Sequence, residues 1–202
     1  MPSDFDPGTG LGPRLRAARE ERGLSVRELA RRIGCSASLI SQIERGVSVP
    51  SVGVLYSLAT SLGSSSDYLL FGSLSAAAPG PEVGASRPIV QRGGGRKIID
   101  LASGVRWERL TPQSDARADF LEVVYSPGGH STDERRPLRH EGREYGLVIS
   151  GTLQANVGFE SYELGPGDSI AFDSSTPHEY LNKTGEVVRA IWVVVHAEPG
   201  RG

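Results

Sequence analysis

The stretch from Ser25 to Pro50, SVRELARRIGCSASLISQIERGVSVP, constrains the fold of this chain most, because it predicts two short helices joined by a tight turn. Ser25 and Glu28 have the spacing of a capping box, in which each side chain can satisfy a free N–H group at a helix start. Gly34 can end the first helix, and Ser36 can cap the second almost at once. The stretch therefore has the form of a helix–turn–helix.

The second helix, which is expected to end at Gly46, has one apolar and one polar face. Ile40 and Ile43 have helical spacing and are expected to face inward. The outward positions carry small residues and one amide: Ala37, Ser38, Ser41 and Gln42. A helix–turn–helix of this size has few roles other than entering the DNA major groove, where a Gln can form two hydrogen bonds with adenine. A small helical dimerisation domain with the same core is the alternative.

The distribution of charge favours a nucleic-acid partner for the N-terminal part. Between Thr9 and Pro50 there are eight Arg and four Glu, a local net charge of +4, whereas the whole chain has −2. These arginines can line phosphates and release counterions: Arg14, Arg16, Arg19, Arg22, Arg27, Arg31, Arg32 and Arg45. Residues 97–202 carry 11 basic and 16 acidic residues and are not expected to touch DNA.

Composition and periodicity predict two domains and a linker. Helices over 51–62 and 65–70, with one before Gly23, complete a five-helix unit that we place at residues 9–72. Residues 73–96 are rich in Ala, Gly, Pro and Ser and are expected to form a linker. From Lys97 the period changes to two, in short runs separated by Gly, Pro, Asp and Asn. That pattern predicts an all-β barrel or sandwich over 97–198.

The same composition limits where the protein works. No apolar run reaches the ~18 residues that a membrane span requires, and the acidic start MPSDFDPGTG is unlike a signal or transit peptide. The single cysteine, Cys35, cannot form an internal disulfide. We therefore expect a cytoplasmic protein without a membrane partner, in which Cys35 fills the turn; a redox switch there is the alternative.

Two segments of the β part carry candidate chemistry: RHEGREYGLVISG over 139–151 and GDSIAFDSSTPHEYLN over 167–182. In a strand, alternate residues share a face, so His178, Tyr180 and Asn182 are expected to point together. His140 and Glu144 also share parity, although a glycine between them can bend the chain. Two imidazoles and one carboxylate suit a divalent iron, manganese, nickel or zinc ion with open positions. Without a metal, the same side chains can bond a small ligand.

Residues 11–71 resemble the lambda-repressor-like, or XRE, family of helix–turn–helix DNA-binding domains, most specifically in ISQIERG followed by VPS. The resemblance implies that Ala37, Ser38 and Gln42 face bases, and that Ser41 and Arg45 lie near the phosphate backbone. The candidate DNA-binding residues are Arg27, Ser36, Ala37, Ser38, Ser41, Gln42 and Arg45.

The β part resembles the cupin family of jelly-roll barrels. The first cupin motif is matched by His140, Glu144 and Gly151, and the second by Gly167, His178 and Asn182. Leu138 stands where many cupins have another His, and Asp173 and Ser175 replace the usual Pro and Gly; His130 is a candidate replacement ligand, although a loop His is more often solvated. The resemblance implies a metal on His140, Glu144 and His178. The candidate effector pocket is Leu138, His140, Glu144, His178, Tyr180 and Asn182.

Together the two parts resemble helix–turn–helix–cupin transcriptional regulators. The resemblance implies a homodimer that binds a double-stranded DNA operator with half-sites about 34 Å apart and responds to a small-molecule effector. The alternative is a mononuclear non-haem iron oxygenase of the hydroxypropylphosphonate epoxidase type, whose iron sits on a His, a Glu four residues later and a second His. The Arg-rich helix–turn–helix, and the lack of a separate general acid, general base or substrate clamp, favour the regulator.

Overall fold

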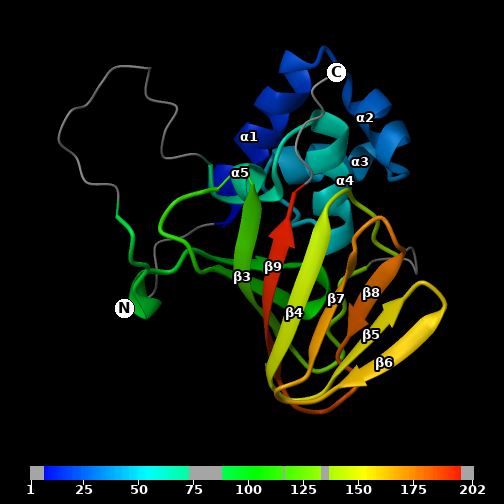
Figure 1. Cartoon of the computed structure of the whole chain (residues 1–202). Coiled ribbons are helices and arrows are strands. Elements are labelled where there is room, and N and C mark those ends of the chain that lie inside the picture. The colour runs from blue at the N-terminus through cyan, green and yellow to red at the C-terminus, as the bar shows by residue number, and fades with distance from the viewer. Residues whose placement is uncertain (1–6, 73–87, 116, 133–136, 197–202) are drawn as a thin grey trace.

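The computed structural model describes residues 7–72, 88–115, 117–132 and 137–196 (Figure 1). Most of the predicted linker, residues 73–87, lies outside these ranges. Within the described ranges, no helix is long and apolar enough to cross a membrane.

The N-terminal part consists of five helices, as the sequence predicts. They are α1 (Pro7–Glu21), α2 (Val26–Ile33), α3 (Ala37–Glu44), α4 (Val52–Leu62) and α5 (Ser66–Phe71). A serine caps each of the last four, because its hydroxyl accepts a hydrogen bond from the backbone N–H three residues later.

The turn between α2 and α3 forms as expected, with two differences in detail. Gly34 adopts the left-handed conformation that ends α2, and Ser36 caps α3. Only half of the predicted capping box is present, because Glu28 accepts a hydrogen bond from Arg32. Helix α3 ends at Glu44, shortly before the expected Gly46.

The C-terminal part is an antiparallel β structure, which confirms the all-β prediction. Its strands are β1 (Ile98–Leu101), β2 (Val105–Arg109), β3 (Ala118–Tyr125), β4 (Arg143–Ser150), β5 (Leu153–Val157), β6 (Glu160–Leu164), β7 (Ser169–Asp173), β8 (His178–Leu181) and β9 (Val188–Val195). They form a six-stranded sheet in the order β1-β2-β3-β9-β4-β7 and a three-stranded sheet in the order β6-β5-β8. Side chains alternate in and out along β4 and β9, so that one face of the large sheet is buried.

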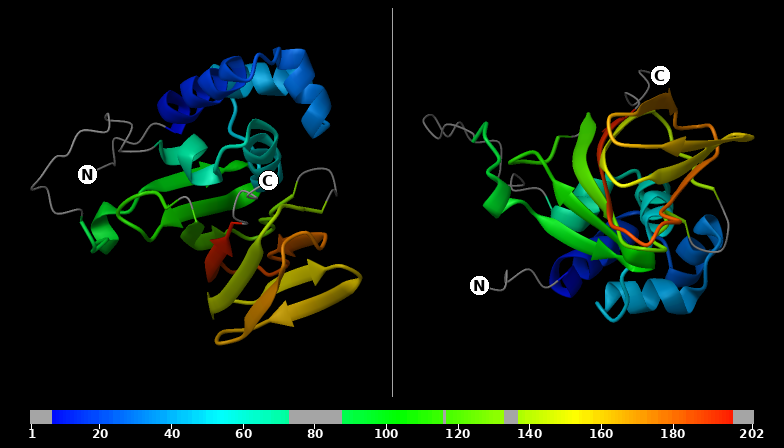
Figure 2. Two further views of the ribbon diagram at one scale, coloured as in Figure 1. Left: turned by 45° about the horizontal axis from the view of Figure 1, so that its top comes forward. Right: turned by 90° about the horizontal axis from the view of Figure 1, so that it is seen from below.

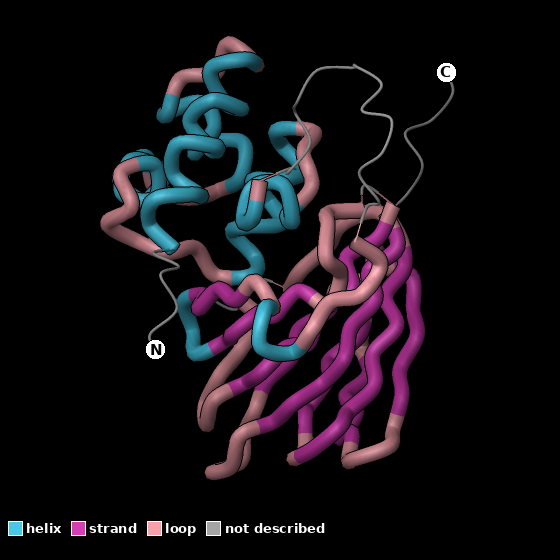
Figure 3. The backbone as a smooth tube through the Cα atoms, turned by 90° about the vertical axis from the view of Figure 1, so that its left-hand side faces the viewer, coloured by secondary structure: helices cyan, strands magenta, loops and turns pink. Residues whose placement is uncertain are grey.

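The helices stand at one end of the β structure (Figures 1 and 3). Helix α4 lies between the other helices and the strands (Figure 2). Helix α5 is tied to β3 and β2 by two buried polar contacts: Ser66 donates to Asp119 at 2.7 Å, and Asp67 forms an ion pair with Arg109 at 3.2 Å. The described parts of the two units are therefore in direct contact.

Candidate functional site

Helix α3 is held by its inner face and leaves its outer face available. Ile40 and Ile43 are fully buried. The Arg19 guanidinium donates two hydrogen bonds to the Glu44 carboxylate at the end of α3, at 2.6 and 3.0 Å. Gly12 of α1 lies so close that an added Cβ would be 2.5 Å from the Glu44 carbonyl oxygen. These contacts fix the direction of α3 relative to α1.

The predicted base-facing residues lie on the outer face of α3. Ser38 is exposed, and Ala37 and Gln42 are partly exposed. The Gln42 side-chain amide makes no hydrogen bond to any described residue, so both its donors and its acceptor can meet a base edge. Ser41 is partly exposed on the same helix, and Arg45 is exposed at its end.

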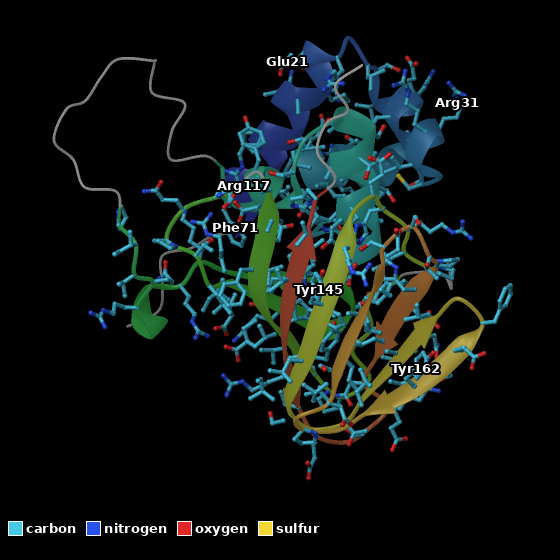
Figure 4. All side chains as sticks on the ribbon, viewed as in Figure 1. Glu21, Arg31, Phe71, Arg117, Tyr145 and Tyr162 are labelled. Carbon is cyan, nitrogen blue, oxygen red and sulfur yellow. The ribbon has the colours of Figure 1, made fainter. Side chains whose placement is uncertain are left out.

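The arginines that were predicted to line phosphates divide into two groups. Arg14 and Arg19 are internal: Arg14 donates to the carbonyls of Leu69 and Leu70, and Arg19 binds Glu44. Their role is structural, and the phosphate prediction is wrong for them. The exposed group includes Arg27, Arg31 and Arg45. Arg31 projects from α2 at the end of the helical unit farthest from the strands (Figure 4).

The second candidate site is a buried cluster that joins the two sheets. His140 lies just before β4, Glu144 lies on β4 in the large sheet, and His178 begins β8 in the small sheet. One Glu144 oxygen lies 2.7 Å from His140 Nε2 and 3.1 Å from His178 Nε2. Gly142, with a φ of 109°, makes the bend that brings His140 and Glu144 together. All three side chains are at least 95% buried.

The electrostatics of the cluster favour an ionised carboxylate. Burial alone would raise the pKa of Glu144, but the hydrogen bond from His140 and the close approach of the His178 ring outweigh it and hold the pKa at about 2. Tyr180 donates to the other Glu144 oxygen at 2.6 Å. Burial, and then the charge of Glu144, raise the pKa of Tyr180 well above its usual value, so its phenol remains a donor.

The donor set fits a metal ion. His178 Nδ1 contacts the Thr176 carbonyl at 2.8 Å, and His140 Nδ1 contacts the Glu141 carbonyl at 3.3 Å, so in both rings Nε2 faces the carboxylate. Such outer contacts orient histidines that bind metals. His178 Nε2 is buried and has no hydrogen-bond partner among the described residues. The candidate ligand atoms all lie within 4.8 Å of one another.

The other residues of the predicted pocket have different positions. Leu138 pairs with His178 in an isolated bridge and lines the same small cavity as Glu144 and Tyr180. Asn182 is buried, but its amide donates to the carbonyls of Tyr125, Ser126 and Glu186, so it anchors a turn and does not face the cluster.

His130 does not supply a replacement ligand. Its Nδ1 contacts the Thr132 carbonyl, and it is not part of the group of residues that can share a metal. The described residues therefore offer three ligands, and Leu138 leaves the fourth cupin position apolar.

Four aromatic side chains around the cluster were not predicted as site residues. Trp107, Tyr125 and Trp192 line the cavity from the large sheet, and Tyr180 packs on Trp192 with ring centroids 4.3 Å apart. Tyr56 comes from α4 and stacks on His140 with centroids 4.3 Å apart. Alternation along β2 and β9 marks the tryptophans as inward-facing, but no local pattern in α4 indicates that Tyr56 reaches the cluster.

Comparison with known proteins supports the two-part organisation. A helix–turn–helix family model matches residues 15–69, and a cupin domain model matches residues 121–194. The chain is 28% identical over 188 residues to the HTH-type transcriptional regulator PuuR of Escherichia coli strain K12, which covers 92% of this chain and 95% of that protein. The chain is a helix–turn–helix transcriptional regulator with a cupin domain.

Solved structures extend the likeness to the whole regulator. The crystal structure of an HTH_3 family transcriptional regulator from Vibrio cholerae superposes with a TM-score of 0.68, over 96% of this chain and 100% of that chain, at 24% identity. That likeness shows a shared fold. Hydroxypropylphosphonic acid epoxidase from S. wedmorenis aligns over 94% of this chain and 98% of that chain, at 20% identity and a TM-score of 0.46, which is too low to argue from. The comparisons favour the regulator over the oxygenase.

Proposed function

We propose that this DNA-binding regulator senses a small-molecule effector in its cupin barrel, and that a divalent metal on His140, Glu144 and His178 is part of the site. The observation that carries the proposal is the buried His178 Nε2, which faces Glu144 at 3.1 Å without a hydrogen bond. A barrel that only had to pack would not bury two imidazoles and a carboxylate, because polar groups lose solvation there. Iron, manganese, nickel and zinc all suit this donor set, and a bound ion supplies a Lewis acid for an effector.

For DNA binding, we assign the roles on α3 and its surroundings by exposure and chemistry. Ala37, Ser38 and Gln42 are the proposed base-reading positions. The proposed phosphate contacts are Arg27, Ser41 and Arg45, together with Ser36 at the helix start. Phosphate contacts set the register of the protein on DNA, and base contacts select the sequence.

We also propose that the regulator is a homodimer, with the outer face of the large sheet as its interface. Phe120 and Tyr145 both lie beside Val193 on neighbouring strands, and Leu147 and Ile149 continue the row along β4. Four of these large apolar side chains are exposed by about two-fifths to one-half. A second copy of the chain would cover this patch and hold two recognition helices about 34 Å apart. We further propose that the regulator works in the cytoplasm, which the one free cysteine and the proposed partners, an operator and a metabolite, support.

The first experiment is selection of bound genomic fragments with the purified protein, with metal content assayed on the same sample. The proposal predicts a pseudo-palindromic site whose half-sites lie about one helical turn apart. No enriched sequence, combined with stoichiometric iron, would contradict it and favour the oxygenase.

The metal site has its own test in cobalt(II) titration of metal-free protein, followed by visible absorbance. His178→Ala removes one of three ligands and is expected to weaken cobalt binding by at least ~10-fold. His130→Ala removes a histidine outside the cluster and is the matched control. Equal binding by both variants would place the metal elsewhere.

A further inference from the structure

The DNA-binding unit itself closes the mouth of the barrel. The backbone N–H of Gly53 in α4 donates to the Ser131 carbonyl at 3.1 Å, and the N–H of Ala102 donates to the Pro50 carbonyl, also at 3.1 Å. Val52 and Tyr56 of α4 are buried and line the same cavity as Glu144. Helix α4 therefore packs in the helical core and also lines the barrel site.

The Tyr56 ring packs directly against the candidate metal site. It stacks face to face on the candidate metal ligand His140, with ring centroids 4.3 Å apart and planes 8° apart. The edge of Trp107 meets it at 5.7 Å and 61°. The parallel ring and the edge-on ring form a slot around Tyr56 whose shape and quadrupoles suit a planar group.

With Tyr56 in place, the cavity beside its ring has no room for an organic molecule. The cavity between Tyr56, Glu144 and Tyr180 has a volume of about 20 Å³, enough for one water molecule or one bare cation. Two larger clefts, of about 470 and 530 Å³, lie between the helical unit and the barrel, and Tyr56 lines both. A small molecule can thus reach Tyr56 from outside, but it cannot enter the cavity beside Glu144 while the ring is there.

We propose that Tyr56 occupies the site where the effector binds, so that docking of α4 on the barrel and binding of an organic ligand exclude each other. The ligand class that fits is a planar ring of about the size of phenol, which takes over the stack on His140. This inference rests on the proposed function, because it takes the barrel as the sensing site.

The exclusion gives the regulator a direct route from ligand to DNA. Leu55, Leu58 and Leu62 of α4 are fully buried in the helical core that also holds α2 and α3, so α4 carries the recognition helix with it. A ligand that displaces Tyr56 therefore loosens the docking of α4 on the barrel and shifts the recognition helix with it. Only undocked molecules can bind the ligand, so its apparent affinity equals the intrinsic affinity multiplied by the undocked fraction.

The test uses p-cresol, which is the tyrosine side chain as a free molecule. Its binding is followed by fluorescence, because the chain has only two tryptophans and both Trp107 and Trp192 line the cavity. Docking is followed by hydrogen exchange at the Gly53 and Ala102 amides. Adding p-cresol to the wild-type protein is expected to speed exchange at both amides, while amides inside α2 and β9 keep their protection.

Tyr56→Ala is expected to bind p-cresol at least ~10-fold tighter than wild type and to lose protection at Gly53 and Ala102. Tyr68→Ala, which truncates a partly exposed tyrosine on α5, is the matched control and should behave as wild type.

Gly53→Leu loosens docking at the contact between the two units, because a Cβ there would lie 3.0 Å from a methyl group of Leu138. This variant replaces Tyr56→Ala in the test if Tyr56→Ala fails to fold, and it should likewise bind p-cresol more tightly than wild type. Wild-type affinity in the folded variants, or binding to wild type that leaves both amides protected, would overturn the inference. Neither result involves DNA or metal, so the proposed function would still stand on its own tests.

Discussion

Gln42 and Arg45 lie one turn apart at the end of α3, and the structure leaves both side chains accessible. We expect Gln42→Ala to weaken binding to the selected operator by ~1–3 kcal/mol while leaving nonspecific binding nearly unchanged, because a bidentate contact to adenine discriminates by about that amount. Arg45→Ala should instead weaken binding to all sequences and reduce the salt dependence, because it removes a phosphate contact.

The measurement is a set of DNA titrations at several salt concentrations, on the operator and on a scrambled duplex. Arg117→Ala is the control, because Arg117 is an exposed arginine that pairs with Asp115 just before β3, outside the helix–turn–helix (Figure 4). Identical behaviour of the Gln42 and Arg45 variants would refute the assignment of base and phosphate roles.

Single residues also show what the sequence could and could not predict. The spacing of His140 and Glu144 predicted their pairing, but the structure brings them together through the bend at Gly142, since His140 lies before β4. The predicted phosphate role of Arg14 and Arg19 was wrong, because the pattern of a helix does not reveal which long cations turn back to cap neighbouring carbonyls or carboxylates. The place of Tyr56 depends on how two units pack, which no local pattern encodes.

At the scale of elements, the start of β4 depends on the conformation of Gly142. Its φ is 109°, and an added Cβ would lie 2.0 Å from the Val195 carbonyl oxygen of β9. We expect Gly142→Ala to destabilise the protein by ~2 kcal/mol or more, since it combines backbone strain with a steric clash. The change should also weaken cobalt binding, because His140 and Glu144 lie on either side of this bend.

Gly167→Ala is the matched control for that change. Gly167 also has a positive φ, of 91°, but no atom lies within 4 Å of its added Cβ, so only the backbone strain remains. Urea unfolding and cobalt titration of both variants separate the two effects. If Gly167→Ala costs as much stability as Gly142→Ala, the close contact with β9 does not matter.

The junction of α5 with β3 and the end of β9 should respond to pH through His196. Its Nε2 lies 3.4 Å from the Asp119 carboxylate, which also accepts from Ser66 of α5. Contact with Asp119 raises the pKa of His196, although burial partly offsets it, and the charges of Asp67 and Asp115 raise it further. A raised folded-state pKa stabilises the fold below the unfolded value of about 6.5, and that stabilisation is lost as pH rises through the folded pKa.

Urea unfolding between pH 6 and pH 9 measures this effect. The wild-type protein is expected to lose unfolding free energy over that interval, and His196→Gln should show a flatter profile. The same loss in both proteins would assign the pH dependence to another group.

For the whole molecule, the sequence established the order of the units and their fold types, because helical and strand periodicities are local. It did not reveal that the helical unit covers the barrel, since no local pattern indicates how the two units pack. The contact is built from scattered groups: Gly53 and Tyr56 on α4, and Ser66 and Asp67 on α5. The signal route is therefore expected to run through α4, in addition to any ordering of the linker.

The proposed dimer is a property of the whole molecule, and two tyrosines test it. Tyr145 on the large sheet and Tyr162 on the small sheet are each 45% exposed (Figure 4), but only Tyr145 lies in the proposed interface. Tyr145→Lys places a charge in that interface and should raise the dimer dissociation constant at least ~10-fold, which corresponds to about 1.4 kcal/mol. Tyr162→Lys should leave the dimer dissociation constant unchanged.

Analytical ultracentrifugation measures the dimer dissociation constant. Operator binding should weaken only in the Tyr145 variant, since two half-sites need two linked recognition helices. Dissociation by Tyr162→Lys alone would move the interface to the small sheet.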